Sequence, residues 1–244
     1  MIRNLKLSGL ALVAALALSA VSATGVSATT QIKGDFFCDA YPCTISGEQP
    51  AAEKHKFVTA AGAVECEVAK FSSTTIASTT SSISVHPTYE KCVLNNNLTG
   101  TTDPTTVTVN GCYYTLTVHY HQTSKGALVT DDQFSGDKHL ICPDETKPIE
   151  IHVFKATDKE HKEATKCTYH IKPQTIDNVD YLDHTSSAID VRTTESPISV
   201  KRTSGSLLNC GAENQTAKYS GKVEMKCASD PQGATTACGI ETTP

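Results

Sequence analysis

Histidines on strand-like segments are the first residues whose spacing could support chemistry. His119 and His121 lie two residues apart, so on a β-strand both imidazoles project from the same face. Neutral imidazole is a ligand for zinc and copper. Two such side chains do not complete a metal site, so a third ligand has to come from a neighbouring strand. The candidates for it are His139, His152 and His170.

The residues around this histidine pair predict which way it faces. Cys112, Tyr114, Leu116, Val118 and Tyr120 alternate with polar residues, which assigns them to a core and sends the histidines to solvent. No carboxylate stands at a spacing diagnostic of a metal site. Two interpretations therefore stay open for this face: metal capture, or ordinary surface histidines on a Thr-rich sheet.

Motifs for hydrolytic catalysis are missing from the sequence. It contains neither G-x-S-x-G nor H-E-x-x-H, and no compact Ser/His/Asp order stands out. We therefore assign no catalytic residue and no cofactor, although a site assembled from distant residues would leave no motif. The formal net charge is −5 and there is no basic stripe, which argues against nucleic acid as a partner.

The ten cysteines are the second chemically informative set. Their number is even and no C-x-x-C occurs, so disulfides are favoured over a redox centre or a zinc knuckle. The segments that follow Cys112 and precede Cys142 look like one hairpin, which places these two cysteines opposite each other. A weak similarity between two stretches suggests two further pairs, and local loops supply the last two. The predicted pairs are Cys66–Cys92, Cys112–Cys142, Cys167–Cys210, Cys38–Cys43 and Cys227–Cys238, with a Cys112–Cys167 bridge as the main rival.

The N-terminal residues have the order of a secretory signal. Arg3 and Lys6 provide the positive region, Leu10–Leu18 is a short apolar run, and Val26-Ser27-Ala28 is a small-residue cleavage site. We expect cleavage after Ala28, with Ala23 as second choice, and a secreted, extracellular product. No later stretch reaches the length of a membrane span.

The elements that would position these residues are predicted to be β-strands. Apolar residues recur with period two, as in Ile149-Ile151-Val153 and Cys167-Tyr169-Ile171, and turn residues follow about every ten positions. This pattern predicts an all-β, antiparallel, disulfide-stapled sandwich. The predicted organisation is a signal peptide (1–28), two β-rich halves (29–142 and 143–227) and a small, polar C-terminal tail (228–244). Duplication and chance explain the similarity of the halves equally well.

Several phrases resemble a known group of proteins. They are Tyr41-Pro42-x-Thr44-x-Ser46-Gly47, His55-x-Phe57, Ala61-Gly62-x-Val64-x-Cys66, Val85-His86-Pro87-Thr88-Tyr89, Val109-Asn110-Gly111-Cys112 and Ile141-Cys142-Pro143. Between about Asp39 and Tyr219 the chain resembles uncharacterised secreted, cysteine-containing bacterial proteins, mostly actinobacterial. Cys38, Cys43, Cys227 and Cys238 are additions to that pattern. The resemblance implies export and β-structure, and no site residue.

These observations favour a non-catalytic extracellular or cell-envelope protein, either a binding or adhesion module or a structural one. The alternatives are a secreted hydrolase with a dispersed active site and metal capture through the exposed histidine face.

Overall fold

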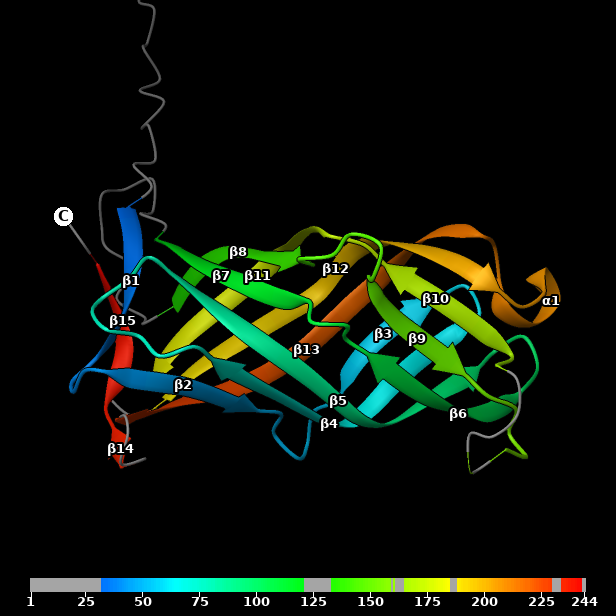
Figure 1. Ribbon diagram of the computed structural model, residues 1–244, viewed down its shortest axis with the longest axis horizontal. Coiled ribbons are helices and arrows are strands. Elements are labelled where there is room, and N and C mark those ends of the chain that lie inside the picture. Colours follow the sequence, from blue (N-terminus) through cyan, green and yellow to red (C-terminus); the bar gives the residue numbers. More distant parts are fainter. Residues whose placement is uncertain are drawn as a thin grey trace, which may run out of the picture.

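A computed structural model describes residues 32–120, 133–158, 160, 165–184, 188–229 and 234–242 (Figure 1). These residues form a 15-stranded sheet in which the strand pairs are antiparallel, so the predicted all-β, disulfide-stapled fold is confirmed. The elements in chain order are β1 (Ile32–Cys38), β2 (Cys43–Glu48), β3 (His55–Thr59), β4 (Gly62–Ser73), β5 (Ser82–Asn96), β6 (Thr101–Thr108), β7 (Tyr113–Tyr120), β8 (Gln133–Ile141), β9 (Ile149–Val153), β10 (Cys167–Ile171), β11 (Gln174–His184), β12 (Ala188–Ser204), α1 (Leu207–Cys210), β13 (Asn214–Ser229), β14 (Thr235–Thr236) and β15 (Cys238–Thr242).

The sheet closes on itself in two rings. The first ring runs β13, β2, β4, β5, β7, β8, β11, β12 and back to β13. The second runs β13, β3, β4, β5, β6, β9, β10, β12 and back to β13. In Figure 1, β5 and β7 cross in front of β12 and β13, so two layers face each other as in a sandwich. Closure leaves most strands without a free edge.

Four strands belong to both rings, and their length explains how. β4, β5, β12 and β13 have 12, 15, 17 and 16 residues, and each pairs with different partners at its two ends. β12, for example, pairs with β11 at one end and with β10 at the other. A bulge between Thr193 and Ser196 interrupts its register with β13, and Glu195 there has a positive φ of 41°. Bulges bend strands, which lets β12 turn from the first ring into the second.

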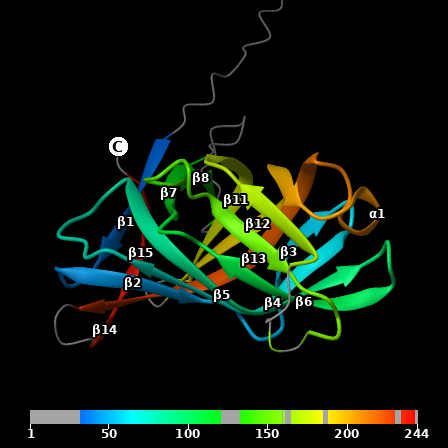
Figure 2. The same cartoon turned by 45° about the vertical axis from the view of Figure 1, so that its right-hand side comes forward.

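The interior of both rings is built from the apolar side of each strand. In β9 the residues Ile149, Ile151 and Val153 are buried, whereas Glu150 and His152 between them are half-exposed. In β7 the same alternation buries Tyr114, Leu116 and Val118, as period two predicted. The turned view in Figure 2 shows strands from both predicted halves of the chain contributing to the same closed sheet.

The only helix among the described residues is the single turn α1. No helix in the described parts of the chain is long and apolar enough to cross a membrane. The predicted leader, residues 1–28, lies outside the described residues. The C-terminal segment that we expected to be a polar tail contains β14 and β15, which pair with β13 and β1.

Five disulfides cross-link the strands and the segments that connect them, and none of the ten cysteines is free. The pairs are the five that the sequence suggested: Cys38–Cys43, Cys66–Cys92, Cys112–Cys142, Cys167–Cys210 and Cys227–Cys238. The β7–β8 register, with Tyr113 opposite Ile141, brings Cys112 beside Cys142, as the hairpin argument expected. The rival bridge from Cys112 to Cys167 is not formed.

Candidate functional site: a buried lysine, histidine and tyrosine cluster

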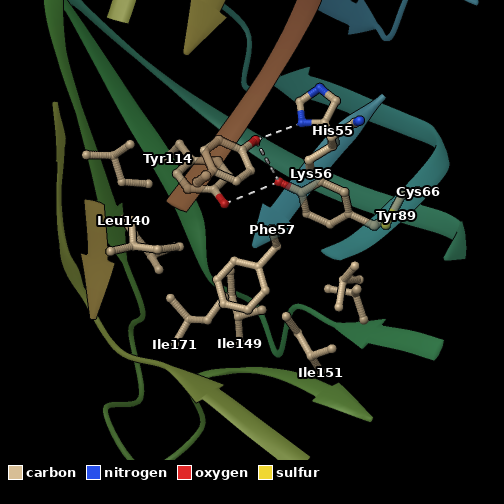
Figure 3. A pocket seen from close by; sticks show the side chains of 15 residues that line it. His55, Lys56, Phe57, Cys66, Tyr89, Tyr114, Leu140, Ile149, Ile151 and Ile171 are labelled. Atoms are coloured by element: carbon tan, nitrogen blue, oxygen red, sulfur yellow. Dashed lines mark hydrogen bonds between the residues drawn. The ribbon is translucent and has the colours of Figure 1, made fainter. Parts of the chain in front are cut away.

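The interior of the second ring contains a small cavity with one polar end. Its volume is about 40 Å³, room for a few water molecules. Figure 3 shows aliphatic residues, among them Leu140, Ile149 and Ile171, at one end of it. His55 and tyrosine hydroxyls lie at the other end. His55 also lines a second, smaller void inside the first ring, so the polar residues stand between the two interiors.

A directional chain of hydrogen bonds joins these polar side chains. His55 Nε2 lies 3.2 Å from the carbonyl oxygen of Lys222, which can only accept, so Nε2 carries the proton. Nδ1 of the neutral ring therefore accepts the hydroxyl proton of Tyr219 at 2.7 Å. The Tyr89 hydroxyl lies 3.5 Å from that of Tyr219 and 3.2 Å from that of Tyr114. The chain links β3, β5, β7 and β13 through their side chains.

Lys138, on β8, is the least expected member of this cluster. It is 4% exposed, and its ammonium group lies over the rings of Tyr114 and Tyr219, 4.0 and 4.8 Å from their centroids. Nζ also donates to the Tyr219 hydroxyl oxygen at 3.5 Å. Nζ also lies 5.6 Å from the centroid of the Phe71 ring. Cation–π attraction offsets part of the cost of removing the ammonium group from water.

Burial shifts the pKa values of these groups away from their ordinary values. Desolvation lowers the pKa of Lys138 to about 7. Desolvation, and then the charge of Lys138, lower the pKa of His55 to about 3. Burial raises the pKa of Tyr114 to about 12 and raises the pKa values of Tyr89 and Tyr219 as well. At neutral pH the histidine is therefore neutral and the tyrosines keep their protons.

The cluster is enclosed, and this limits what it can do. His55 is 3% exposed, and Tyr114 and Tyr219 are buried. A polymer or a large substrate cannot reach these groups, because a substrate site needs a path to the reacting atoms. What the arrangement does achieve is mechanical: it joins β5 and β13, which both rings share, to β3, β7 and β8.

Gly221 on β13 shows that the packing around His55 is specific. A Cβ at this position would lie 2.4 Å from His55 Nδ1 and 2.6 Å from Cε1, far inside contact distance. The glycine therefore makes the space in which the imidazole packs against its aromatic neighbours, whose ring centroids lie 5.5 Å away for Phe71 and 5.9 Å for Tyr89.

The described histidines that the sequence proposed for metal binding, His119, His139, His152 and His170, lie outside this cluster and are partly exposed. His119, on β7, lies 3.2 Å from the carboxylate of Asp137. His139, on β8, bonds the hydroxyl of Thr175 on β11 at 3.1 Å. His121 lies outside the described residues. All three were proposed as ligands of one ion, and the two that are described have separate partners.

The other two candidate ligands lie on the second ring, on β9 and β10. Glu150 is opposite His170 in the strand register, and its oxygens lie 2.9 Å from His152 Nε2 and 3.7 Å from His170 Nε2. Within the described ranges there is no group of three or more His, Cys, Asp or Glu side chains that could hold a metal ion. The outward facing that strand parity predicted for His119, His152 and His170 agrees with their partial exposure.

Sequence reasoning missed the cluster itself. Strand parity carried a signal for it: Phe134, Lys138 and Leu140 are buried on the same side of β8, and a lysine in that series marks an internal charge. His55-x-Phe57 carried the same signal on β3, where both side chains are buried. Nothing in the sequence indicated that Lys138 and His55 would meet in space.

Fold and site together define an all-β protein, stapled by five disulfides, whose titratable cluster is part of its core. No protein-family model, curated protein or solved structure matches the chain.

Proposed function

We propose that this chain is an exported, non-catalytic protein of the extracellular space or cell envelope, with a structural or adhesive role. The observation that carries this proposal is that the side chains best suited to chemistry are buried in the core. His55, Tyr114, Tyr219 and Lys138 are buried, and hydrogen bonds join them through Tyr219 and Tyr89, so they hold strands together and do not face a substrate.

The location in this proposal has two independent supports. Disulfide-rich chains are typical of oxidising, extracellular compartments, and all ten cysteines here are paired. The N-terminal sequence has the order of a secretory signal, with Arg3 and Lys6 before the apolar run. The acidic net charge of −5 favours partners other than nucleic acid.

Export is tested by the mass of the secreted chain. When the full-length gene is expressed with its own leader, we expect protein in the culture medium whose first residue follows Ala28. Intact-mass analysis after reduction measures this. A chain that stays in the cytoplasm and begins at Met1 would contradict the proposed location.

The absence of catalysis is tested by a turnover screen on purified, oxidised protein. We expect no hydrolysis of ester, glycoside or peptide substrates above the level given by a Lys138→Met/His55→Phe variant, which lacks both basic groups of the cluster. Turnover that is robust in the natural chain and abolished by one substitution would reject the proposal in favour of a hydrolase.

If the role is adhesive, we expect the folded protein to be retained on isolated cell envelopes.

A further inference from the structure

A second buried polar group lies next to α1, because one of its members donates a hydrogen bond to the backbone of that helix; Figure 1 shows where α1 lies in the fold. The group consists of Asn96 at the end of β5, Asp103 on β6, and Lys166 just before β10. Lys166 Nζ lies 2.7 Å from Asp103 Oδ2, and Asn96 Nδ2 lies 3.4 Å from the same oxygen. Asp103 is fully buried, Asn96 is 2% exposed, and the Lys166 side chain is 14% exposed.

The amide of Asn96 is held in an activated arrangement. Its Oδ1 accepts the backbone N–H groups of Leu98 and Thr99 at 3.0 and 3.1 Å. Two N–H donors on one carbonyl oxygen polarise the carbonyl and stabilise the negative charge that a nucleophilic attack would place there. The Asn96 Nδ2 group also donates to the carbonyl of Asn209 at 3.0 Å, which fixes the orientation of the amide.

The amine that would act as nucleophile contacts the same Asp103 oxygen as this amide. Lys166 Nζ lies 3.5 Å from Thr99 Oγ1, in the same turn whose N–H groups bind the Asn96 oxygen. The Asp103 carboxylate therefore contacts both the amine and the nitrogen that would leave. Its second oxygen accepts the Thr101 hydroxyl at 3.0 Å, which keeps it in place. A nucleophile, a proton carrier and a polarised carbonyl meet in one buried site.

We propose that Lys166 and Asn96 join in an intramolecular amide bond, formed by the chain itself with Asp103 as proton carrier. Asp103 takes a proton from the Lys166 ammonium, and the free amine attacks Asn96 Cγ. The Leu98 and Thr99 N–H groups bind the oxygen of the tetrahedral intermediate. Asp103 returns the proton to Nδ2 as the Cγ–Nδ2 bond breaks, and the attacking nitrogen gives its extra proton to the departing ammonia. Overall, the ammonium and the side-chain amide become a substituted amide and one ammonium ion, without an oxidant.

The bond would brace the end of the second ring that lies next to α1. It would join the end of β5 to the segment before β10, next to the Cys167–Cys210 disulfide. Unlike a disulfide, an amide survives reducing conditions. The inference goes beyond the proposed function and does not depend on it, because the bond forms from the three side chains whatever the protein binds.

The test is the mass of the full secreted chain after complete reduction. We expect the natural chain, and the control Lys172→Arg, to be lighter than their sequences by one ammonia, and proteolysis to give a branched peptide that joins Asn96 to Lys166. Lys166→Arg, which keeps the charge pairing, and Asp103→Ala should both have the full sequence mass, with circular dichroism reporting whether each is folded.

Three results would overturn the proposal. They are a natural chain of full mass without the branched peptide, loss of ammonia that persists in Lys166→Arg, and loss of water with a peptide that joins Lys166 to Asp103. The first would show that Lys166 and Asp103 form only an ion pair. The second would show that an asparagine cyclises. The third would show that Asp103, and not Asn96, supplies the acyl group.

Discussion

At the scale of single residues, the charge on Lys138 decides how stability depends on pH. In the unfolded chain a lysine keeps its proton up to about pH 10.5, whereas in the fold the pKa of Lys138 is about 7. Between these values the unfolded state binds more protons, so the free energy of unfolding rises with pH. His55 acts in the same sense at lower pH: its pKa falls from 6.5 to about 3, so stability is lost as pH falls through this range.

We therefore predict that Lys138→Met stabilises the protein near pH 6, by about 1–4 kcal/mol, because methionine fills the space without a buried charge. The rise in unfolding free energy between pH 7 and 10.5 should flatten in the same variant. Denaturant unfolding at several pH values measures both effects. Lys70→Met is the matched control, because Lys70 lies on an exposed face with its side chain 55% accessible, and it should leave the pH profile unchanged. A variant destabilised at every pH would mean that the cation–π contacts outweigh the desolvation of the amine.

Gly221→Ala tests the packing of His55. The added methyl would overlap the imidazole, so we expect a loss of about 1–3 kcal/mol in unfolding free energy. Removing the imidazole makes room for the methyl, so the two changes should couple: Gly221→Ala should cost much less in a His55→Ala background. Equal costs in both backgrounds, measured by a double-mutant cycle, would show that the glycine is needed for its backbone and not for the histidine.

At the scale of elements, the sequence predicted what local patterns determine. Period two gave the strands, and the hairpin argument gave the cysteine pair that the β7–β8 register places together. The cluster could not be found in this way, because His55 and Tyr219 are 164 residues apart and meet only when β3 pairs with β13. For the same reason the sequence could not tell whether the proposed metal ligands would lie together: parity fixes the face of a strand, but not which strands are neighbours.

Disulfides at this scale should contribute according to the loops they close. Replacing Cys112 and Cys142 by alanine opens a loop with a sequence separation of 30 and should cost about 3–4 kcal/mol. Replacing Cys38 and Cys43, separated by 5 residues, should cost about 2 kcal/mol. Guanidinium unfolding of the two double variants gives the comparison. A larger loss for the short loop would mean that native-state contacts, and not chain entropy, dominate.

At the scale of the whole molecule, the two rings should unfold together. β4, β5, β12 and β13 run through both, so neither ring can lose its strands while the other keeps them. We predict a single transition, in which far-ultraviolet circular dichroism and tyrosine fluorescence follow the same denaturant curve. Two separated transitions would show that the predicted halves are independent folding units.

The central claim is that the reactive side chains belong to a closed core and not to an active site. Amine labelling of the native protein with a small acylating reagent near pH 8, read residue by residue by peptide mass analysis, tests it most directly. The low pKa of Lys138 would make it the fastest lysine to react if reagent could reach it. We predict that Lys138 stays unmodified while exposed Lys70 and Lys226 react, and that it reacts only after unfolding. Labelling of Lys138 in the folded protein as fast as Lys70 would contradict the claim and point to an accessible amine site.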